Sequence, residues 1–176
     1  MAFAIMLPMY SLYITNNKEF TLTLDLTGKV SLVTGSSRGL GLAIARQLAK
    51  SGSDIILCSR TETPLFEIKD QLSKMYPSSR VEAIQADVSL ESDVTRLFSF
   101  IDKTWSRLDI CVNNAAILKL ANFIDYDLAL WNTVISANLT SAFLCSHAAF
   151  KLMSRDSASK KSIVNIGSLS GIRGIE

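Results

Sequence analysis

The sequence predicts an α/β fold in which a doubly wound parallel sheet carries helices on both faces. From Lys29 onward, short apolar runs alternate with longer amphipathic runs, which is the pattern of repeated strand–helix–strand units. The short runs are apolar on both faces, as expected for parallel strands that helices cover on each side. The predicted strands are Val30–Thr34, Ile55–Ser59, Val81–Ala86, Leu108–Val112 and Ser162–Ile166.

The segments between these strands indicate four helices. Each segment places its apolar side chains on one stripe, and caps or helix-breaking residues mark its ends. Right-handed crossovers would bring the carboxyl ends of all the strands to one edge of the sheet. The predicted helices are Gly39–Ser51, which ends at Gly52; the segment from Thr63-Pro64, as cap and first helical residue, to Tyr76-Pro77; the segment capped by Ser89; and a long segment that runs through Trp131 to about Met153.

Length and composition favour one domain and exclude several functions. The 176 residues are 48% hydrophobic, which is enough for one sizeable core. The formal charge is only +2 and the basic residues are scattered, so no nucleic acid partner is expected. Cys58, Cys111 and Cys145 lie at unrelated spacings within apolar runs, which favours reduced, buried thiols in a cytoplasmic protein over disulfides. No metal site is predicted, and His147 is expected to be structural.

The periodic pattern begins near Asp25, which divides the chain into an amino-terminal extension, residues 1–25, and one domain, residues 26–176. Met1–Ile14 is apolar, but it has no basic region, contains Pro8 and is too short to span a bilayer. We therefore expect no membrane partner and an extension that packs on the domain or frays. A weak membrane tether is the minor alternative.

A glycine-rich loop joins the first predicted strand to the first predicted helix. It reads Thr34-Gly35-Ser36-Ser37-Arg38-Gly39-Leu40-Gly41. Gly35 would permit the tight turn, while Gly39 and Gly41 lack the Cβ atoms that would obstruct a pyrophosphate and the packing of the helix. The helix amino terminus would offer unpaired N–H groups and a positive dipole end to phosphates. The strand before the glycines and the helix after them favour dinucleotide binding over an ordinary turn.

The Gly-x-x-x-Gly-x-Gly spacing of this loop resembles that of the short-chain dehydrogenase/reductase family, and further motifs of that family follow in order. These are Asp87-Val88 after the third strand, Asn113-Asn114-Ala115-Ala116 after the fourth, Asn138 in the long helix and Asn165-Ile166-Gly167-Ser168 at the end of the fifth. The resemblance covers Leu26 to the end of the chain. It implies a Rossmann-type fold and an NAD(P)-dependent oxidoreductase.

The resemblance also implies roles for individual residues. Asp87 would contact the adenine, Asn138 would help to hold a water in a proton relay, and Ser168 would donate a hydrogen bond to the substrate oxygen. Asn138 and Ser168 are therefore the predicted catalytic residues. Ala116 stands where the family usually has glycine, and its methyl group should crowd the backbone near the cofactor slightly. The predicted cofactor-binding residues are Gly35, Ser37, Arg38, Gly39, Leu40, Gly41, Ser59, Arg60, Asp87, Val88, Asn114, Ala115 and Ala116.

The end of the second predicted strand indicates which cofactor is used. A carboxylate there would bind the ribose 2′-hydroxyl of NAD and repel a 2′-phosphate, but this chain has Ser59-Arg60. Arg60 and Arg38 could hold a 2′-phosphate through charge-assisted hydrogen bonds. NADP is therefore the expected cofactor, and NAD is the alternative if both arginines are merely solvated.

The family's acid–base tyrosine, followed four residues later by a lysine, lies downstream of the serine, and Glu176 ends this chain first. Tyr126 is no substitute, because no lysine follows it at that spacing. We therefore expect an incomplete Rossmann domain whose C-terminal strands are missing and which is inactive alone. The complete form is expected to exchange hydride between NADP(H) and a small-molecule ketone or secondary alcohol, as a homodimer or homotetramer. The alternative is a catalytically inactive dinucleotide-binding or subunit-interaction module.

Overall fold

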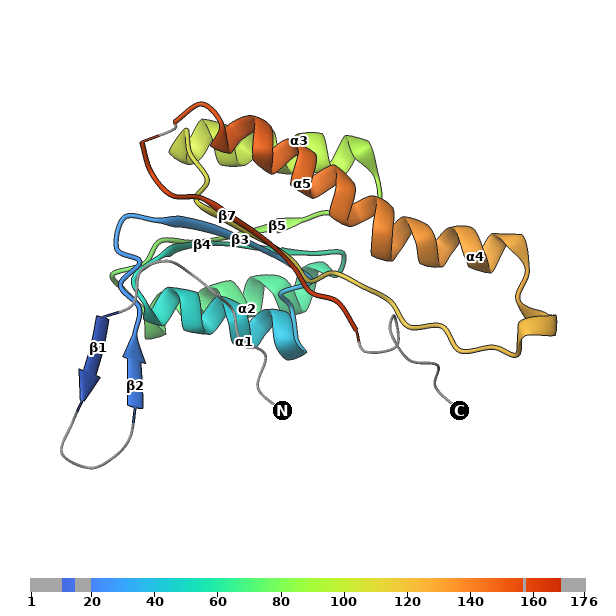
Figure 1. Ribbon diagram of the computed structural model, residues 1–176, viewed down its shortest axis with the longest axis horizontal. Coiled ribbons are helices and arrows are strands. Elements are labelled where there is room, and N and C mark those ends of the chain that lie inside the picture. Colours follow the sequence, from blue (N-terminus) through green and yellow to red (C-terminus); the bar gives the residue numbers. More distant parts are fainter. Residues whose placement is uncertain (1–10, 15–19, 157, 169–176) are drawn as a thin grey trace.

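The computed structural model describes residues 11–14, 20–156 and 158–168. Within these residues, parallel strands form one sheet in the order β5-β4-β3-β6-β7. Figure 1 shows α1 and α2 against one face of this sheet and α3 and α5 against the other, which confirms the predicted doubly wound α/β fold. The elements are β3 (Val30–Thr34), α1 (Gly39–Lys50), β4 (Asp54–Ser59), α2 (Glu62–Met75), β5 (Val81–Gln85), α3 (Glu91–Trp105), β6 (Ile110–Asn113), α5 (Ser141–Met153) and β7 (Ser162–Asn165).

Alternate residues of the central strand β3 point to opposite faces of the sheet and contribute to two separate cores. Val30 and Leu32 pack with residues of α3 and α5, whereas Val33 packs with residues of α1 and α2. Every residue of β3 is buried, because two strands and both helical layers surround it. The glycine loop after Thr34 therefore leaves the sheet at its centre, with β4 on one side and β6 on the other.

The three cysteines are free and buried, as predicted, and all belong to the core beneath α3 and α5. Burial raises the pKa of the Cys58 and Cys111 thiols well above the ordinary value, and it raises that of Cys145 to about 12. These thiols are therefore uncharged at neutral pH and serve as core side chains.

Two helices begin at residues other than those predicted. The N-cap of α2 is Thr61 rather than Thr63, and Pro64 lies within the first turn, where its missing N–H has no partner to lose. The N-cap of α3 is Leu90 rather than Ser89. Ser89 instead donates its hydroxyl and its N–H to the Asp87 carboxylate, at 2.6 and 3.0 Å, so it stabilises the turn before the helix.

The long helix predicted through Trp131 has three consecutive parts. It begins with α4 (Leu128–Ile135), whose N-cap Asp127 accepts a hydrogen bond from the Leu130 N–H, and a π-helical turn, η2 (Ser136–Thr140), joins α4 to α5. The whole segment, Leu128–Met153, is long and apolar enough to cross a membrane by length and composition alone. Within α5, however, Cys145 and other side chains are buried against the sheet, which is the role of a covering helix.

The predicted amino-terminal extension contains two strands that were not predicted. β1 (Ser11–Ile14) pairs with β2 (Phe20–Thr23) in an antiparallel two-stranded sheet that is separate from the main sheet. Residues 1–10, which hold most of the predicted apolar stretch, lie outside the described residues. The boundary at Asp25 remains a prediction.

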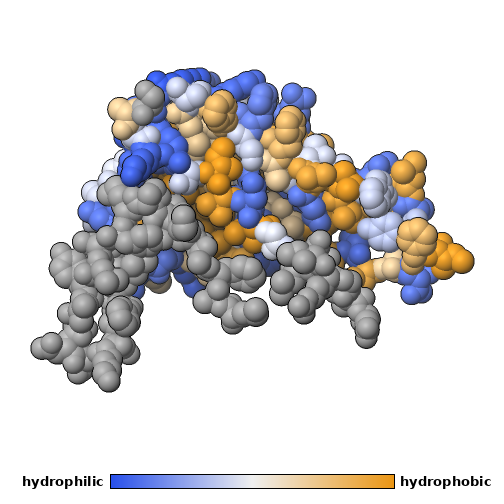
Figure 2. Space-filling view, in the orientation of Figure 1, coloured by the Kyte–Doolittle hydropathy of each residue, from blue (hydrophilic) through white to orange (hydrophobic). Residues whose placement is uncertain are grey.

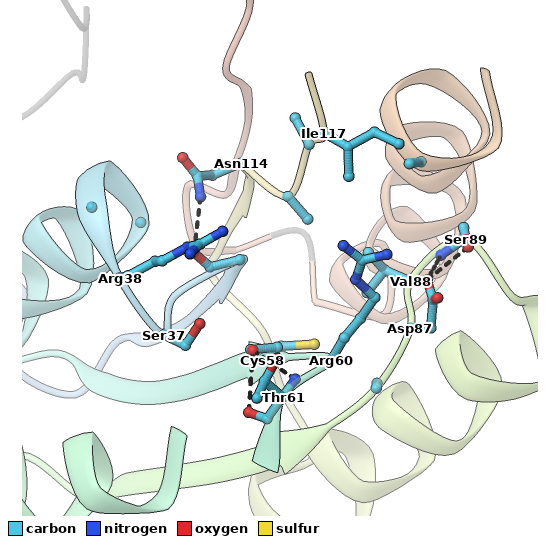
Figure 3. Close-up of a pocket in the computed structure, with 18 of the residues that line it drawn as sticks. Ser37, Arg38, Cys58, Arg60, Thr61, Asp87, Val88, Ser89, Asn114 and Ile117 are labelled. Carbon is cyan, nitrogen blue, oxygen red and sulfur yellow. Dashed lines mark hydrogen bonds between the residues drawn. The ribbon is translucent and has the colours of Figure 1, made fainter. Parts of the chain in front are cut away.

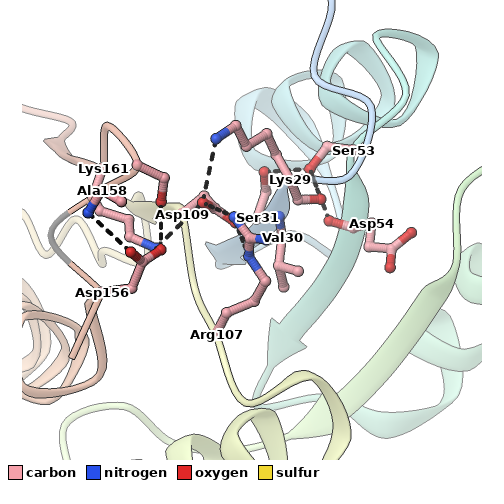
Figure 4. A network of polar contacts seen from close by, with 11 residues as sticks. Lys29, Val30, Ser31, Ser53, Asp54, Arg107, Asp109, Asp156, Ala158 and Lys161 are labelled. Carbon is pink, nitrogen blue, oxygen red and sulfur yellow. Dashed lines mark hydrogen bonds and ion pairs between the residues drawn. The ribbon is translucent and has the colours of Figure 1, made fainter. Parts of the chain in front are cut away.

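A polar network links three strands at the edge of the sheet opposite their carboxyl ends (Figure 4). The Asp109 carboxylate, which is 1% exposed, accepts hydrogen bonds from the Val30 N–H at 3.0 Å and from Arg107 at 2.7 and 2.9 Å. Lys161 and Lys29 lie within 3.5 and 3.6 Å of the same carboxylate. Burial acts to raise the pKa of Asp109, but Arg107 and the Val30 N–H outweigh it and lower that pKa. A charged Asp109 thus joins the starts of β3, β6 and β7.

Apolar side chains are exposed along the loop before α4 and along the outer side of the long helix. Figure 2 shows such side chains at the end of the molecule where this loop lies. The loop includes a short 3-10 turn, η1 (Phe123–Asp125), whose Phe123 and Ile124 are both more than 90% exposed. On α5, Phe143 is 63% exposed and stacks on His147, with ring centroids 5.7 Å apart. The exposed apolar residues of this surface are Leu118, Leu120, Phe123, Ile124, Leu128, Trp131, Leu139, Phe143 and Phe150.

Candidate cofactor and active site

Each glycine of the loop after β3 is needed for a different structural reason. Gly35 and Gly39 adopt φ angles of +65° and +56°, which favour glycine. A Cβ on Gly35 would lie 2.9 Å from the Ala115 Cα, so this turn packs directly on the chain after β6. No atom lies within 4 Å of a Cβ built on Gly39, which leaves open space beside the start of α1. Gly39 therefore suits the predicted close approach of a pyrophosphate.

Gly41 serves packing rather than ligand approach. A Cβ there would collide with the Gly35 carbonyl and lie 2.5 Å from Asn114 Nδ2. The sequence predicts that these two glycines serve both the approach of a pyrophosphate and the packing of the helix. Open space is present at Gly39, and close packing is present at Gly41. At Gly41 the missing side chain lets the first turn of α1 lie against the loop itself.

Two side chains hold the glycine loop to the end of β6. The Thr34 hydroxyl oxygen accepts hydrogen bonds from the N–H groups of Asn114 and Ala115, both at 3.0 Å, and the hydroxyl donates to the Val112 carbonyl at 3.3 Å. The Asn114 Nδ2 donates in turn to the carbonyls of Thr34 and Gly35, at 2.9 and 3.2 Å. Asn114 was predicted as a cofactor residue from its motif, and this structural role was not foreseen. These hydrogen bonds hold the glycine loop in one shape against the end of β6.

A pocket of about 600 Å³ lies at the carboxyl ends of the strands (Figure 3). Every predicted cofactor-binding residue lines it, from the glycine loop, the end of β4, the segment after β5 and the segment after β6. Ala116, which stands where glycine is usual, lies exposed at the border of this pocket. Several lining residues were not predicted, and apart from Pro64 their only signal in the sequence is that each adjoins a predicted site residue: Cys58, Thr61, Pro64, Ala86, Ser89, Ile117 and Ala137.

The charged groups of this pocket are mainly positive. Arg38 and Arg60 both line it and are exposed, and Figure 3 shows their side chains entering from different sides, Arg38 from the start of α1 and Arg60 from the end of β4. Ser59, the last residue of β4, is buried and carries no charge. Asp87 is the acidic side chain among the lining residues, and its Oδ1 accepts both hydrogen bonds from Ser89.

A second cavity, of about 670 Å³, adjoins the first and contains both predicted catalytic residues. Ala115 and Ala116 line both cavities. Ser168 is exposed and follows β7 at the carboxyl edge of the sheet. Asn138 is exposed as well and lies in the π-helical turn η2. The carboxyl edge of the sheet thus holds one polar, basic cavity and a neighbouring one that offers hydroxyl and amide groups.

Tyr126 lines neither of these two cavities. Its sequence position, between β6 and α4, places it in the loop whose apolar side chains are exposed. The structure therefore supports the prediction that this tyrosine does not stand in for the family's acid–base residue.

A fixed glycine loop at a helix amino terminus, beside arginines and at the carboxyl edge of a doubly wound parallel sheet, defines a Rossmann-type domain. The sequence model of the short chain dehydrogenase family matches residues 29–176. The chain belongs to the short-chain dehydrogenase/reductase family.

Individual relatives agree with this membership. The chain is 34% identical, over 150 residues, to the rhamnolipids biosynthesis 3-oxoacyl-[acyl-carrier-protein] reductase of Pseudomonas aeruginosa, covering 84% of this chain and 57% of the relative. A solved RhlG/NADP active-site complex from Pseudomonas aeruginosa has a TM-score of 0.80 at 33% identity, covering 88% of this chain and 60% of the other.

A second solved structure, of a putative short-chain alcohol dehydrogenase from Sinorhizobium meliloti, has a TM-score of 0.79 at 36% identity, covering 87% of this chain and 59% of the other. The chain therefore spans between 57 and 60% of the length of these three relatives.

Proposed function

We propose that the pocket at the glycine loop holds NADP(H), and that the whole protein transfers a hydride between NADP(H) and a small-molecule ketone or secondary alcohol. The observation that carries the proposal is the pair Arg38 and Arg60, which line a pocket where β4 ends in an uncharged serine. Guanidinium groups bind phosphate through paired, charge-assisted hydrogen bonds. The relative solved with NADP supports this choice of cofactor.

The residues present fit a dinucleotide phosphate. The open space at Gly39 leaves room for a pyrophosphate beside the unpaired N–H groups of α1, and α1 has no acidic side chain in its first turn. Both hydrogen bonds from Ser89 go to Asp87 Oδ1, so in this proposal Oδ2 is the atom that accepts a hydrogen bond from the adenine amino group. When bound, the cofactor supplies or accepts the hydride, and the protein binds and orients both reactants.

In the proposed reaction, Ser168 donates a hydrogen bond to the substrate oxygen in the second cavity. Asn138 fixes the loop segment at Ile117 and helps to hold a water for proton transfer. No tyrosine of this sequence is followed four residues later by a lysine. We therefore propose that the chain alone binds the cofactor but does not turn over substrate, since an unassisted hydroxyl is a weak proton donor near neutral pH.

The experiment is a fluorescence titration with NADPH and NADH. Wild-type chain should bind NADPH more tightly, and Arg60→Asp should reverse the order, because a carboxylate would repel the 2′-phosphate and accept a hydrogen bond from the 2′-hydroxyl. Arg46→Asp makes the same charge change on an exposed part of α1 outside the pocket and should leave the preference unchanged. Equal affinities for both cofactors in the wild type would contradict the proposal.

A second candidate function is a catalytically inactive dinucleotide-binding or subunit-interaction module. The exposed aromatic side chains Phe143 and Phe150 on α5 favour it, because a surface of this kind commonly contacts another subunit. A homodimer or homotetramer, and a cytoplasmic location, belong to the proposal for the complete protein. Assaying the complete protein with NADPH and a panel of ketones separates the two, since turnover would exclude the inactive module. Turnover by this chain alone would exclude the module as well, and would also contradict the proposal that the chain alone is inactive.

A further inference from the structure

The peptide unit that follows Arg60 is held by side chains at both of its polar groups. Pairing between β4 and β5 ends at the partners Ser59 and Gln85, so Arg60 lies one residue beyond the ladder. Its carbonyl nevertheless accepts a hydrogen bond from Gln85 Nε2 at 3.0 Å. The N–H of the same peptide unit, that of Thr61, donates to the Ser59 hydroxyl oxygen at 3.1 Å.

Because a peptide unit is planar, fixing both its C=O and its N–H fixes the orientation of the whole plane. The backbone dihedral ψ of Arg60 is therefore set by Gln85 and Ser59. The direction in which the Arg60 side chain leaves the backbone is set with it. Figure 3 shows this side chain extending from the end of β4 into the pocket.

Gln85 is itself anchored to α3. Its carbonyl accepts a hydrogen bond from Arg96 Nη2 at 2.7 Å, and Arg96 also forms an ion pair with Asp93 at 3.3 Å. Asp93 accepts a hydrogen bond from the Asp87 N–H at 2.8 Å. The end of β5 thus connects the backbone of Arg60 to the turn that holds Asp87, although Gln85 does not line the pocket.

We propose that Gln85 is a positioning residue for cofactor specificity, which favours NADP(H) over NAD(H) by holding the backbone of Arg60. The inference rests on the proposed function. An arginine whose base is fixed loses less conformational freedom when its guanidinium binds a phosphate than one on a loose loop. NADH has no 2′-phosphate for Arg60 to bind, so the benefit is confined to NADPH.

The test replaces Gln85 with methionine, which keeps the length of the side chain but cannot donate a hydrogen bond. Gln85→Met should weaken NADPH binding by about three- to tenfold, the effect of losing roughly one hydrogen bond, and leave NADH binding within about twofold. Gln71→Met, at an exposed position of α2 away from the pocket, is the matched control and should change neither the NADPH nor the NADH dissociation constant. Equal weakening of both cofactors would show a general structural role and overturn the inference.

A double-mutant cycle tests whether Gln85 acts through Arg60. In the Arg60→Ala background, Gln85→Met should have no further effect on NADPH binding, because the side chain that it positions is gone. An undiminished effect in that background would also overturn the inference. If the wild type prefers NADPH and Arg60→Ala removes the preference, the proposed function stands however Gln85→Met behaves. If the wild type shows no preference, the proposed function and this inference fail together.

Discussion

The Asn138 side chain makes both of its amide hydrogen bonds to the backbone of Ile117. The Asn138 Oδ1 accepts from the Ile117 N–H at 2.8 Å, and Nδ2 donates to the Ile117 carbonyl at 2.9 Å. Asn138 lies in the π-helical turn η2, whereas Ile117 follows β6 and lines the cofactor pocket (Figure 3). Single π-helical turns within α-helices are frequent at functional sites. The turn η2 carries the Asn138 amide, and this amide joins the long helix to the loop at Ile117.

Asn138→Ala should loosen that loop. Loss of the paired hydrogen bonds should reduce the free energy of unfolding by about 1–2 kcal/mol and speed hydrogen exchange at the Ile117 amide. Chemical denaturation and exchange measured by mass spectrometry test both effects. Asn132→Ala, at an exposed position of α4, serves as the control. Unchanged exchange around Ile117 would show that other contacts hold the loop.

Gly39→Val should abolish cofactor binding. The residue adopts φ +56°, where a β-branched side chain is strained, and the new side chain would enter the space that the pyrophosphate needs. Gly28→Val provides a matched control, because Gly28 has φ +74°, also with no atom within 4 Å of its Cβ, and does not line the pocket. Titration should show binding lost in the first variant and kept in the second. Binding that survives Gly39→Val would mean that the dinucleotide does not lie on this loop.

Asp109→Asn should destabilise the fold. The substitution leaves Arg107, Lys161 and Lys29 facing a neutral amide at a buried site. Losing these charge-assisted hydrogen bonds should cost about 1–3 kcal/mol, because the cations left behind are partly exposed to solvent. Urea denaturation measures the loss, and Asp70→Asn, on the exposed side of α2, is the control. A loss no larger than that of the control would show that the network contributes little.

The lowered pKa of Asp109 predicts that the stability of the fold depends on pH. Because the pKa of Asp109 is lowered in the folded chain, its contribution is fully present above the unfolded-state pKa of about 3.9. The contribution is lost as pH falls through the lower, folded-state value. The free energy of unfolding should therefore fall more steeply with acidification in the wild type than in Asp109→Asn. Parallel curves for the two proteins between pH 5 and pH 2 would contradict this.

The exposed aromatic side chains of α5 should cause self-association. Replacing Phe143 and Phe150 together with lysine should shift the chain toward monomer at micromolar concentration, because it removes apolar surface and adds charge. Analytical ultracentrifugation detects the shift. Phe66→Lys, on the partly exposed face of α2, should leave the distribution as in the wild type. A wild-type chain that sediments as a single monomer would exclude this association.

Features whose requirements are local could be predicted from the sequence. The glycine loop is one, because a positive φ at Gly35 and Gly39 and the start of α1 depend on a few consecutive residues. The contact between Gln85 and Arg60 is different: 25 residues separate them, and only the register of β4 against β5 brings them together. Their pairing could not be inferred without the sheet.

Errors at element boundaries have similar causes. Thr63-Pro64 carries a local signal for a helix start, but the hydrogen bond from the Thr61 N–H to Ser59 fixes the chain two residues earlier. The alternation of apolar and polar residues in Phe20–Thr23 would have indicated a strand, had that segment not been assigned to the extension. Neither the π-helical turn nor the partner of Asn138 has a sequence signature that would have identified it.

The strand order also determines when the pocket can form as the chain is synthesised. β3, β4 and β5 pair in sequence on one side, but the other edge of β3 pairs with β6, whose preceding Asp109 is 79 residues beyond Val30. At synthesis rates of about 5–20 residues per second, roughly 1–5 s pass between the emergence of Gln85 and that of Ile110. During that interval the edge of β3 is unpaired, and Asn114, whose amide holds the carbonyls of Thr34 and Gly35, has not yet emerged. A nascent chain therefore exposes the glycines of this loop before the side chain that fixes their shape has emerged.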